Sequence, residues 1–116
     1  MRRKKPSGLR RDIQPRVKRR DIYLDGNEIK DRSDFYIRIG KLLGWGPYFG
    51  HNLSALWDVM TTEMKLGTTL HWKNSDVSRR RLKEEFDRVE KLFEDKVIWD
   101  KKLGRTKEEQ FKYIME

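Results

Sequence analysis

The chain has 116 residues, which suits one domain built around a single hydrophobic core. Its 41% of charged residues and 35% of hydrophobic residues indicate a small core with a large polar surface. The absence of cysteine excludes disulfide bonds and thiolate metal sites, and no apolar run approaches the roughly 18 residues of a membrane span. The basic N-terminus has no hydrophobic segment behind it, so we expect no secretory signal and a soluble, cytoplasmic protein.

The net charge of +9 is concentrated in the first twenty residues. The chain has 28 Lys and Arg and 19 Asp and Glu; residues 1–20 hold ten of the bases and one of the acids, so the remaining 18 of each cancel. With two prolines and few apolar side chains, residues 1–20 are predicted to form a basic, disordered arm in front of a folded domain, residues 21–116. The arm can bind nucleic acid weakly and without sequence preference, follow an acidic membrane surface, or simply keep the protein soluble; of these partners, we do not expect the membrane.

The first predicted elements are a strand and a helix. Residues 21–24 alternate in polarity as a short strand does, and Asp25-Gly26 marks the turn after it. Ser33 and Asp34 are predicted to open a helix that runs to about Leu43, because its apolar residues recur every three or four positions.

A glycine-rich, aromatic loop then leads into a second helix. Asn52 is predicted to cap this helix, which extends from Leu53 to about Met64. At 100° per residue, one side of it is apolar and the opposite side is small and polar, with Trp57 at the edge. The polar side consists of Ser54, Asp58, Thr61 and Thr62.

The second half of the chain is also predicted to contain a strand followed by helices. Residues 68–72 are predicted to form a strand, and Asn74 or Ser75 to cap a basic helix through Leu82. A longer helix is expected over residues 84–100 or beyond, with Ile98 among its buried apolar residues, before Gly104 ends it. Residues 110–115 fit an edge strand or a continued helix. Strands separated by helices predict a parallel sheet and an α/β fold.

An enzyme is not expected from this sequence. His51, Ser54, Asp58 and His71 supply the residue types of a hydrolase triad, but no nucleophile elbow or oxyanion loop surrounds them. Two histidines without a paired motif do not predict a metal site, and we expect no cofactor.

Several of these segments resemble one family. Asn52–Asp58, preceded by Tyr48-Phe49-Gly50, is similar to the signature of barstar-type ribonuclease inhibitors. Ile22–Gly26, Ser33–Phe35 and Leu70–Trp72 also occur at the spacings of that family, so the resemblance covers residues 21–116. It implies a small barstar-like α/β fold, with a three-stranded parallel sheet and four helices. It also implies an intracellular bacterial immunity protein that blocks a cognate ribonuclease or nuclease toxin in a one-to-one complex.

The resemblance implies a partner-binding surface on the loop and helix of residues 46–64. Asp58 corresponds to the family's central inhibitory aspartate, whose carboxylate takes the place of the substrate phosphate among the cations of a ribonuclease site. Asp95 corresponds to a further acidic contact through an alignment with one gap, and is equally well a solvated surface charge. The other family contact positions are Tyr48, Asn52, Leu53, Ser54, Trp57 and Thr61. Of these, Trp57 can fill the core, form part of the interface or do both, and Leu53 fits the core better than a contact.

The chain departs from the family at three positions of this surface. Ser54 stands where a second carboxylate is common, His51 where an acid or small polar residue is common, and Glu63 where the best-known member has tryptophan. These departures predict a slower or weaker inhibitor, or a different cognate enzyme. The alternative function is a nucleic-acid-associated or regulatory protein that is anchored by its basic arm and binds a partner other than a nuclease.

Overall fold

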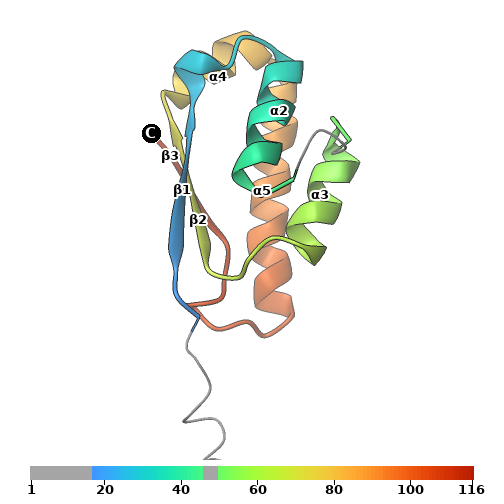
Figure 1. Ribbon diagram of the computed structural model, residues 1–116, viewed down its shortest axis with the longest axis vertical. Helices are drawn as coiled ribbons and strands as arrows, with labels where there is room; N and C mark the ends of the chain where they lie inside the picture. Colours follow the sequence, from blue (N-terminus) through green and yellow to red (C-terminus); the bar gives the residue numbers. More distant parts are fainter. Residues whose placement is uncertain (1–16, 46–49) are drawn as a thin grey trace, which may run out of the picture.

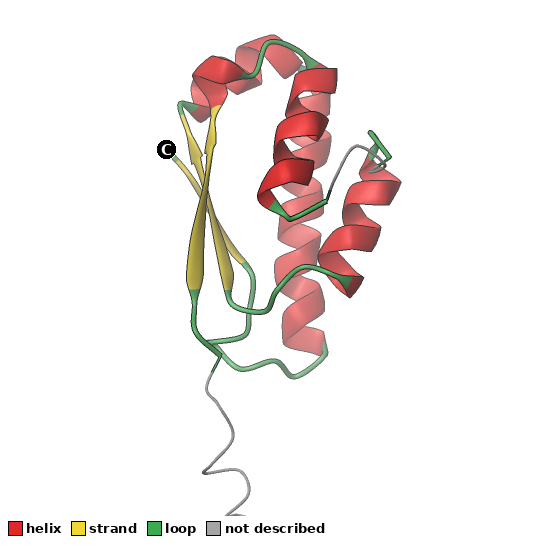
Figure 2. Ribbon diagram, in the orientation of Figure 1, coloured by secondary structure: helices red, strands yellow, loops and turns green. Residues whose placement is uncertain are grey.

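The structure is a computed structural model that describes residues 17–45 and 50–116 (Figure 1). Within these residues, a three-stranded parallel sheet in the order β1-β2-β3 is combined with four α-helices, which confirms the predicted α/β architecture. The helices pack against one face of the sheet or over its end, and the other face is open (Figure 2). The elements are β1 (Arg20–Asp25), a short 3-10 helix η1 (Gly26–Glu28), α2 (Arg32–Leu42), α3 (Leu53–Thr62), β2 (Thr68–Lys73), α4 (Ser75–Leu82), α5 (Glu84–Lys102) and β3 (Lys112–Met115).

The core lies between the sheet and the helices. Alternate residues of β1, Ile22 and Leu24, are buried there, as the pattern of a half-covered strand requires. Trp72 of β2 is central: its ring lies 5.3 Å from that of Phe35 and 4.9 Å from that of Phe86. Each large apolar side chain buried in this way contributes about 1.5–3 kcal/mol to stability.

Two helix starts differ in detail from the sequence prediction. Asp31, not Ser33 or Asp34, caps α2, because its carboxylate accepts the backbone N–H of Asp34 at 2.9 Å. Asn74 precedes α4 but makes no side-chain cap; it has a left-handed backbone (φ 52°), and its amide donates to the Asp25 carboxylate at 2.9 Å. The pairing of β3 with β2 shows that the last segment is a strand and does not continue a helix.

The buried side of α5 carries an ion pair that the sequence pattern did not reveal. Lys96 and Asp100 are each 1% exposed, whereas Ile98, which the helical period predicts to be buried, is 42% exposed. The Asp100 carboxylate accepts from the ammonium of Lys96, from Arg105 at 3.0 Å and from the backbone N–H of Phe111 at 2.7 Å. Burial lowers the pKa of Lys96, while Asp100 opposes that shift. This network fixes the end of α5 to the beginning of β3.

The folded region includes residues that the sequence prediction assigned to the arm. β1 begins at Arg20, and the guanidinium of Arg19 donates to the carbonyls of Lys107, Glu108 and Gln110 at 2.9–3.1 Å. Figure 2 shows the loop after α5 returning to this end of the sheet. Residues 17–116 hold 21 of the 28 Lys and Arg and 18 of the 19 Asp and Glu, so they carry a net charge of +3 instead of zero.

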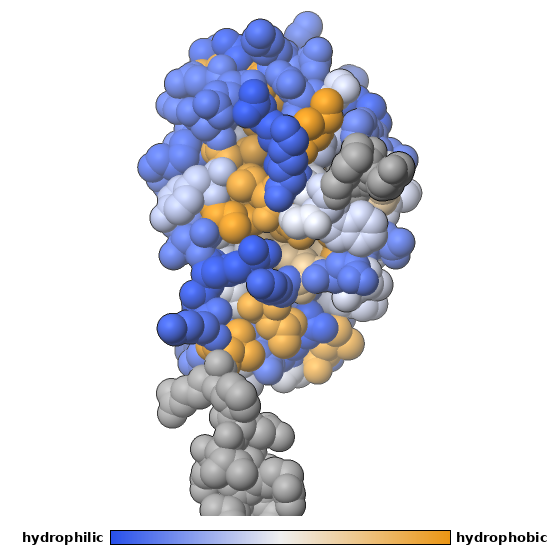
Figure 3. Space-filling view, in the orientation of Figure 1, coloured by the Kyte–Doolittle hydropathy of each residue, from blue (hydrophilic) through white to orange (hydrophobic). Residues whose placement is uncertain are grey.

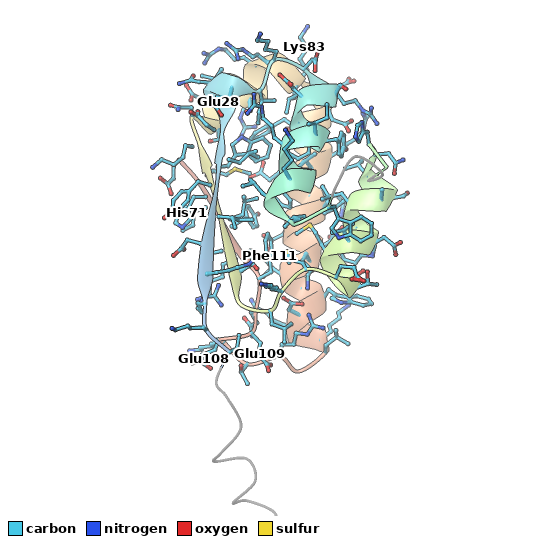
Figure 4. All side chains as sticks on the ribbon, in the orientation of Figure 1. Glu28, His71, Lys83, Glu108, Glu109 and Phe111 are labelled. Atoms are coloured by element: carbon cyan, nitrogen blue, oxygen red, sulfur yellow. The ribbon has the colours of Figure 1, made fainter. Side chains whose placement is uncertain are left out.

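The open face of the sheet carries a histidine between two carboxylates. Nε2 of His71 lies 2.8 Å from Asp21, and Nδ1 lies 2.8 Å from Glu116. Both carboxylates accept hydrogen bonds only, so both contacts are satisfied together when the ring is doubly protonated. The Tyr23 ring stacks on the imidazole at 4.7 Å, and Lys73 also binds Glu116. In Figure 4, His71 lies on the side of the sheet away from the helices.

This arrangement predicts a pH-dependent contribution to stability. The hydrogen bonds to Asp21 and then Glu116 raise the pKa of His71 above its ordinary value of about 6.5. The folded state therefore binds the proton more tightly than the unfolded chain does. The contribution is complete below about pH 6.5 and is lost as the pH rises through the folded-state pKa.

An NMR titration of His71 tests this prediction. We expect Asp21→Asn to lower the pKa of His71, because the substitution removes the carboxylate on Nε2. Asp87→Asn, on α5, is a control that leaves the titration unchanged. A wild-type His71 that titrates at its ordinary value would show that these contacts do not hold the charged ring.

Candidate functional site

The site is built on α3, which begins as the sequence predicts. The side-chain oxygen of Asn52 accepts the backbone N–H of Ala55 at 2.8 Å, and the backbone carbonyl of Asn52 accepts the N–H of Leu56 at 3.0 Å. These bonds confirm the predicted cap. Leu56, Val59 and Met60 are buried, so α3 packs firmly on the core and its opposite face is held in one orientation. The helix ends at Thr62, two residues before the predicted end.

The outward face of α3 presents one carboxylate. Ser54, Asp58 and Thr62 are exposed, and Thr61 is half-buried. The hydroxyls of Thr61 and Thr62 donate to the backbone carbonyls of Trp57 and Asp58, so they are bonded to the helix itself. Among residues 17–45 and 50–116, no side chain forms an ion pair or hydrogen bond with the Asp58 carboxylate. Asp58 is therefore available to a cation from outside the chain.

The structure places Asp95 of α5 beside the beginning of α3. A hollow of about 450 Å³ is lined by Leu53, Ser54 and Trp57 from α3, and by Asp95 with its neighbours Arg88, Lys91 and Leu92 from α5. Asp95 is half-buried and pairs with Lys91 at 3.3 Å. The two helices thus bring four of the predicted contact residues to one surface. Tyr48 lies outside the described residues.

The sequence prediction missed the basic and aromatic wall that α5 adds to this surface. Trp99 meets the Trp57 ring edge to face, with ring centres 5.6 Å apart. Arg88 and Lys91 line the hollow, which makes that wall positive. The sequence did contain a signal for this wall. Beside the series of apolar residues that forms the core, α5 carries a second series at three- and four-residue spacing.

The structure separates His71 from the other residues of hydrolase type that the sequence contains. His71 is on the open face of the sheet, on the other side from the helices, so it does not share a site with Ser54 and Asp58 (Figure 4). In the part of the chain that the structure describes, no group of three or more acidic, histidine or cysteine side chains could hold a metal ion. None of the described helices is long and apolar enough to cross a membrane.

Comparison with known families agrees with the fold. The family model described as Barstar (barnase inhibitor) matches residues 19–116. The match begins at Arg19, whose side chain joins the start of β1 to the loop after α5. It covers all three strands and all four helices described above. The chain therefore belongs to the barstar family, whose description is that of a ribonuclease inhibitor.

Proposed function

We propose that this protein binds a barnase-type ribonuclease in a one-to-one complex and blocks its active site with the loop and helix of residues 46–64. The observation that carries the proposal is the exposed Asp58 carboxylate on a helix whose other face is packed into the core. A ribonuclease holds the phosphate of its substrate with cationic side chains. A carboxylate that pairs with no cation among the described residues can take that place without first breaking an ion pair within that part of the chain.

The rigidity of α3 supports the same proposal. The Asn52 cap and the buried side of the helix fix the orientation of Asp58 before binding, so little side-chain or backbone freedom is lost in the complex. The cellular role that follows is that of a cytoplasmic immunity protein, which protects a bacterial cell from a nuclease toxin.

The electrostatic field of the folded region is weaker than this role favours. Ser54 is neutral, residues 17–116 carry a net charge of +3, and Arg88 and Lys91 lie beside α3. Association with a basic ribonuclease is therefore less strongly steered than it would be by an acidic inhibitor.

Adding an acid at position 54 is expected to strengthen binding. Ser54 is the second residue of α3, where a carboxylate also interacts favourably with the helix N-terminus, so Ser54→Asp does not destabilise the fold. With one more charge-assisted contact, we expect about tenfold tighter binding to barnase. Surface plasmon resonance at two salt concentrations measures the change.

Ser33→Asp provides the matched control, because Ser33 is also the second residue of its helix but lies on α2. It adds the same charge at an equivalent helix position. Equal gains from both variants would show that overall charge, and not the α3 face, controls the affinity.

The alternative is a nucleic-acid-associated or regulatory protein anchored by the basic arm. A deletion that tests it ends at residue 16, because Arg19 and Arg20 belong to the fold. Our proposal predicts that the chain without residues 1–16 binds barnase as the full chain does, whereas Asp58→Ala binds it at least a hundredfold more weakly. If the deletion abolishes function and Asp58→Ala is silent, the arm-based alternative replaces the proposal.

A further inference from the structure

The solvent side of α5 carries a row of residues that the packing of the core does not use. Asp95, Ile98, Trp99, Lys102 and Leu103 follow one another at the spacing of a single helix face. The three apolar members are open to solvent: Ile98 is 42% exposed, Trp99 38% and Leu103 54%. On the face drawn in Figure 3, hydrophobic side chains also reach the surface at the lower end of the molecule.

This row forms one wall of a trough beside α3. A second hollow, of about 290 Å³, is lined by Trp57, Asp95, Ile98, Trp99 and Lys102. It shares Trp57 and Asp95 with the hollow at the beginning of α3, so the two are continuous. From Arg88 to Lys102 the trough follows about 21 Å of α5, at 1.5 Å per residue.

The rim of the trough is positive. No carboxylate among the described residues pairs with the Lys102 ammonium, and the exposed Lys91–Asp95 pair is of a kind that contributes at most about 1 kcal/mol. Arg88 lies 3.5 Å from Glu85, whose carboxylate also binds Arg32 at 3.3 Å. The trough therefore combines positive charge with the apolar side chains of Trp57, Ile98 and Trp99.

We propose that this trough binds an acidic and apolar segment of the nuclease, outside its active site. The inference rests on the proposed function of α3 and extends it. Asp58 meets the cationic centre of the enzyme, while Trp57, Trp99 and Lys102 hold a loop that carries an aromatic or aliphatic residue next to an acid.

The size of the surface supports a contact beyond α3. A stable interface buries about 800 Å² on each partner. The ten residues of α3 span only about 15 Å, and the side that carries Leu56, Val59 and Met60 is turned into the core. The α5 row, which is continuous with it, supplies additional apolar area and the aromatic side chains that commonly dominate binding energy.

A peptide titration tests the trough without the nuclease. The probe is a capped peptide, Glu-Asp-Leu-Phe-Asp-Glu, and the counter-probe has lysine in place of every acid. In NMR spectra of the full chain, we expect the acidic peptide to shift the indole N–H signals of Trp57 and Trp99, and the lysine peptide to leave them unchanged. Shifts of equal size with both peptides, or shifts elsewhere on the protein, would overturn the proposal.

A pair of adjacent lysines provides matched variants. Lys102→Glu, on the trough, is expected to weaken binding of the acidic peptide at least fivefold, whereas Lys101→Glu is not, because Lys101 lines a different hollow next to Tyr113. Trp99→Ala should also weaken it, with an unchanged circular dichroism spectrum. Equal effects of the two lysine variants would contradict the proposal.

Two further results distinguish peptide binding in the trough from inhibition by Asp58 and from self-association of the chain. Asp58→Ala should leave peptide binding intact, so a loss of nuclease inhibition in that variant tests the proposed function alone. If sedimentation shows a dimer of the wild-type chain that Trp99→Ala dissociates, the occupant is a second copy and the proposal is wrong.

Discussion

Replacing Asp58 with alanine is expected to weaken the ribonuclease complex at least a hundredfold. In the proposed complex, the carboxylate would lie among cationic side chains of the enzyme, and its removal would leave those charges buried without a partner. Truncation of one member of such a pair typically costs about 2–5 kcal/mol, a range drawn in part from the barnase complex of this family. A hundredfold change corresponds to about 2.7 kcal/mol. Calorimetric titration with barnase measures the difference.

Two controls separate the charge of Asp58 from its effect on the fold. Asp58→Asn keeps the size of the side chain and should lose most of the same affinity. Asp76→Ala removes an exposed acid from α4 and should change the affinity little. Because Asp58 is exposed and unpaired among the described residues, its substitution should change the free energy of unfolding by less than about 0.5 kcal/mol. A loss below fivefold in both Asp58 variants would exclude this residue as the centre of the interface.

Replacing Asp100 with alanine is expected to destabilise the fold by about 3–5 kcal/mol. The substitution leaves the Lys96 ammonium buried without its carboxylate and removes the acceptor for the backbone N–H of Phe111. Both consequences weaken the connection between α5 and β3. Denaturation with urea, followed by circular dichroism, measures the free energy of unfolding.

A double variant tests whether the unpaired charge causes the loss. In Lys96→Met with Asp100→Asn, the buried ammonium is gone and the amide oxygen can still accept the N–H of Phe111. We expect this protein to recover most of the lost stability, since a buried ion pair replaced as a whole is often neutral. A single Asp100→Ala change below about 1 kcal/mol would show that the network does not support the fold.

The sequence was most informative where one physical signal acted alone. Asn52 stands directly before an apolar stripe, so both the cap and the direction of the exposed face followed from the helical period. The fold class also followed from one signal, because strands separated by helices indicate a parallel sheet and an α/β fold. The side that holds Ser54 and Asp58 could thus be predicted before the packing of the helix was known.

Prediction failed where tertiary contacts outweighed residue type. Because Lys96 and Asp100 are charged, the helical period predicted that they are exposed and that the apolar Ile98 is buried. The structure shows the opposite, since Lys96 and Asp100 pair with each other and Asp100 also accepts the N–H of Phe111. Asn74 was a reasonable cap, but a hydrogen bond to Asp25 on another element takes its side chain. Such partners are distant in the chain, and one sequence contains no direct signal for them.

The measurement that tests the central claim most directly is a stoichiometric titration of ribonuclease activity. Purified full-length chain is added to barnase and to further barnase-type ribonucleases, and cleavage of RNA is followed. We predict that the activity of at least one of these enzymes falls linearly and disappears at one equivalent of inhibitor, and that Asp58→Ala leaves most of the activity at one equivalent. Full activity of every enzyme at a tenfold excess of the wild-type chain would contradict the account.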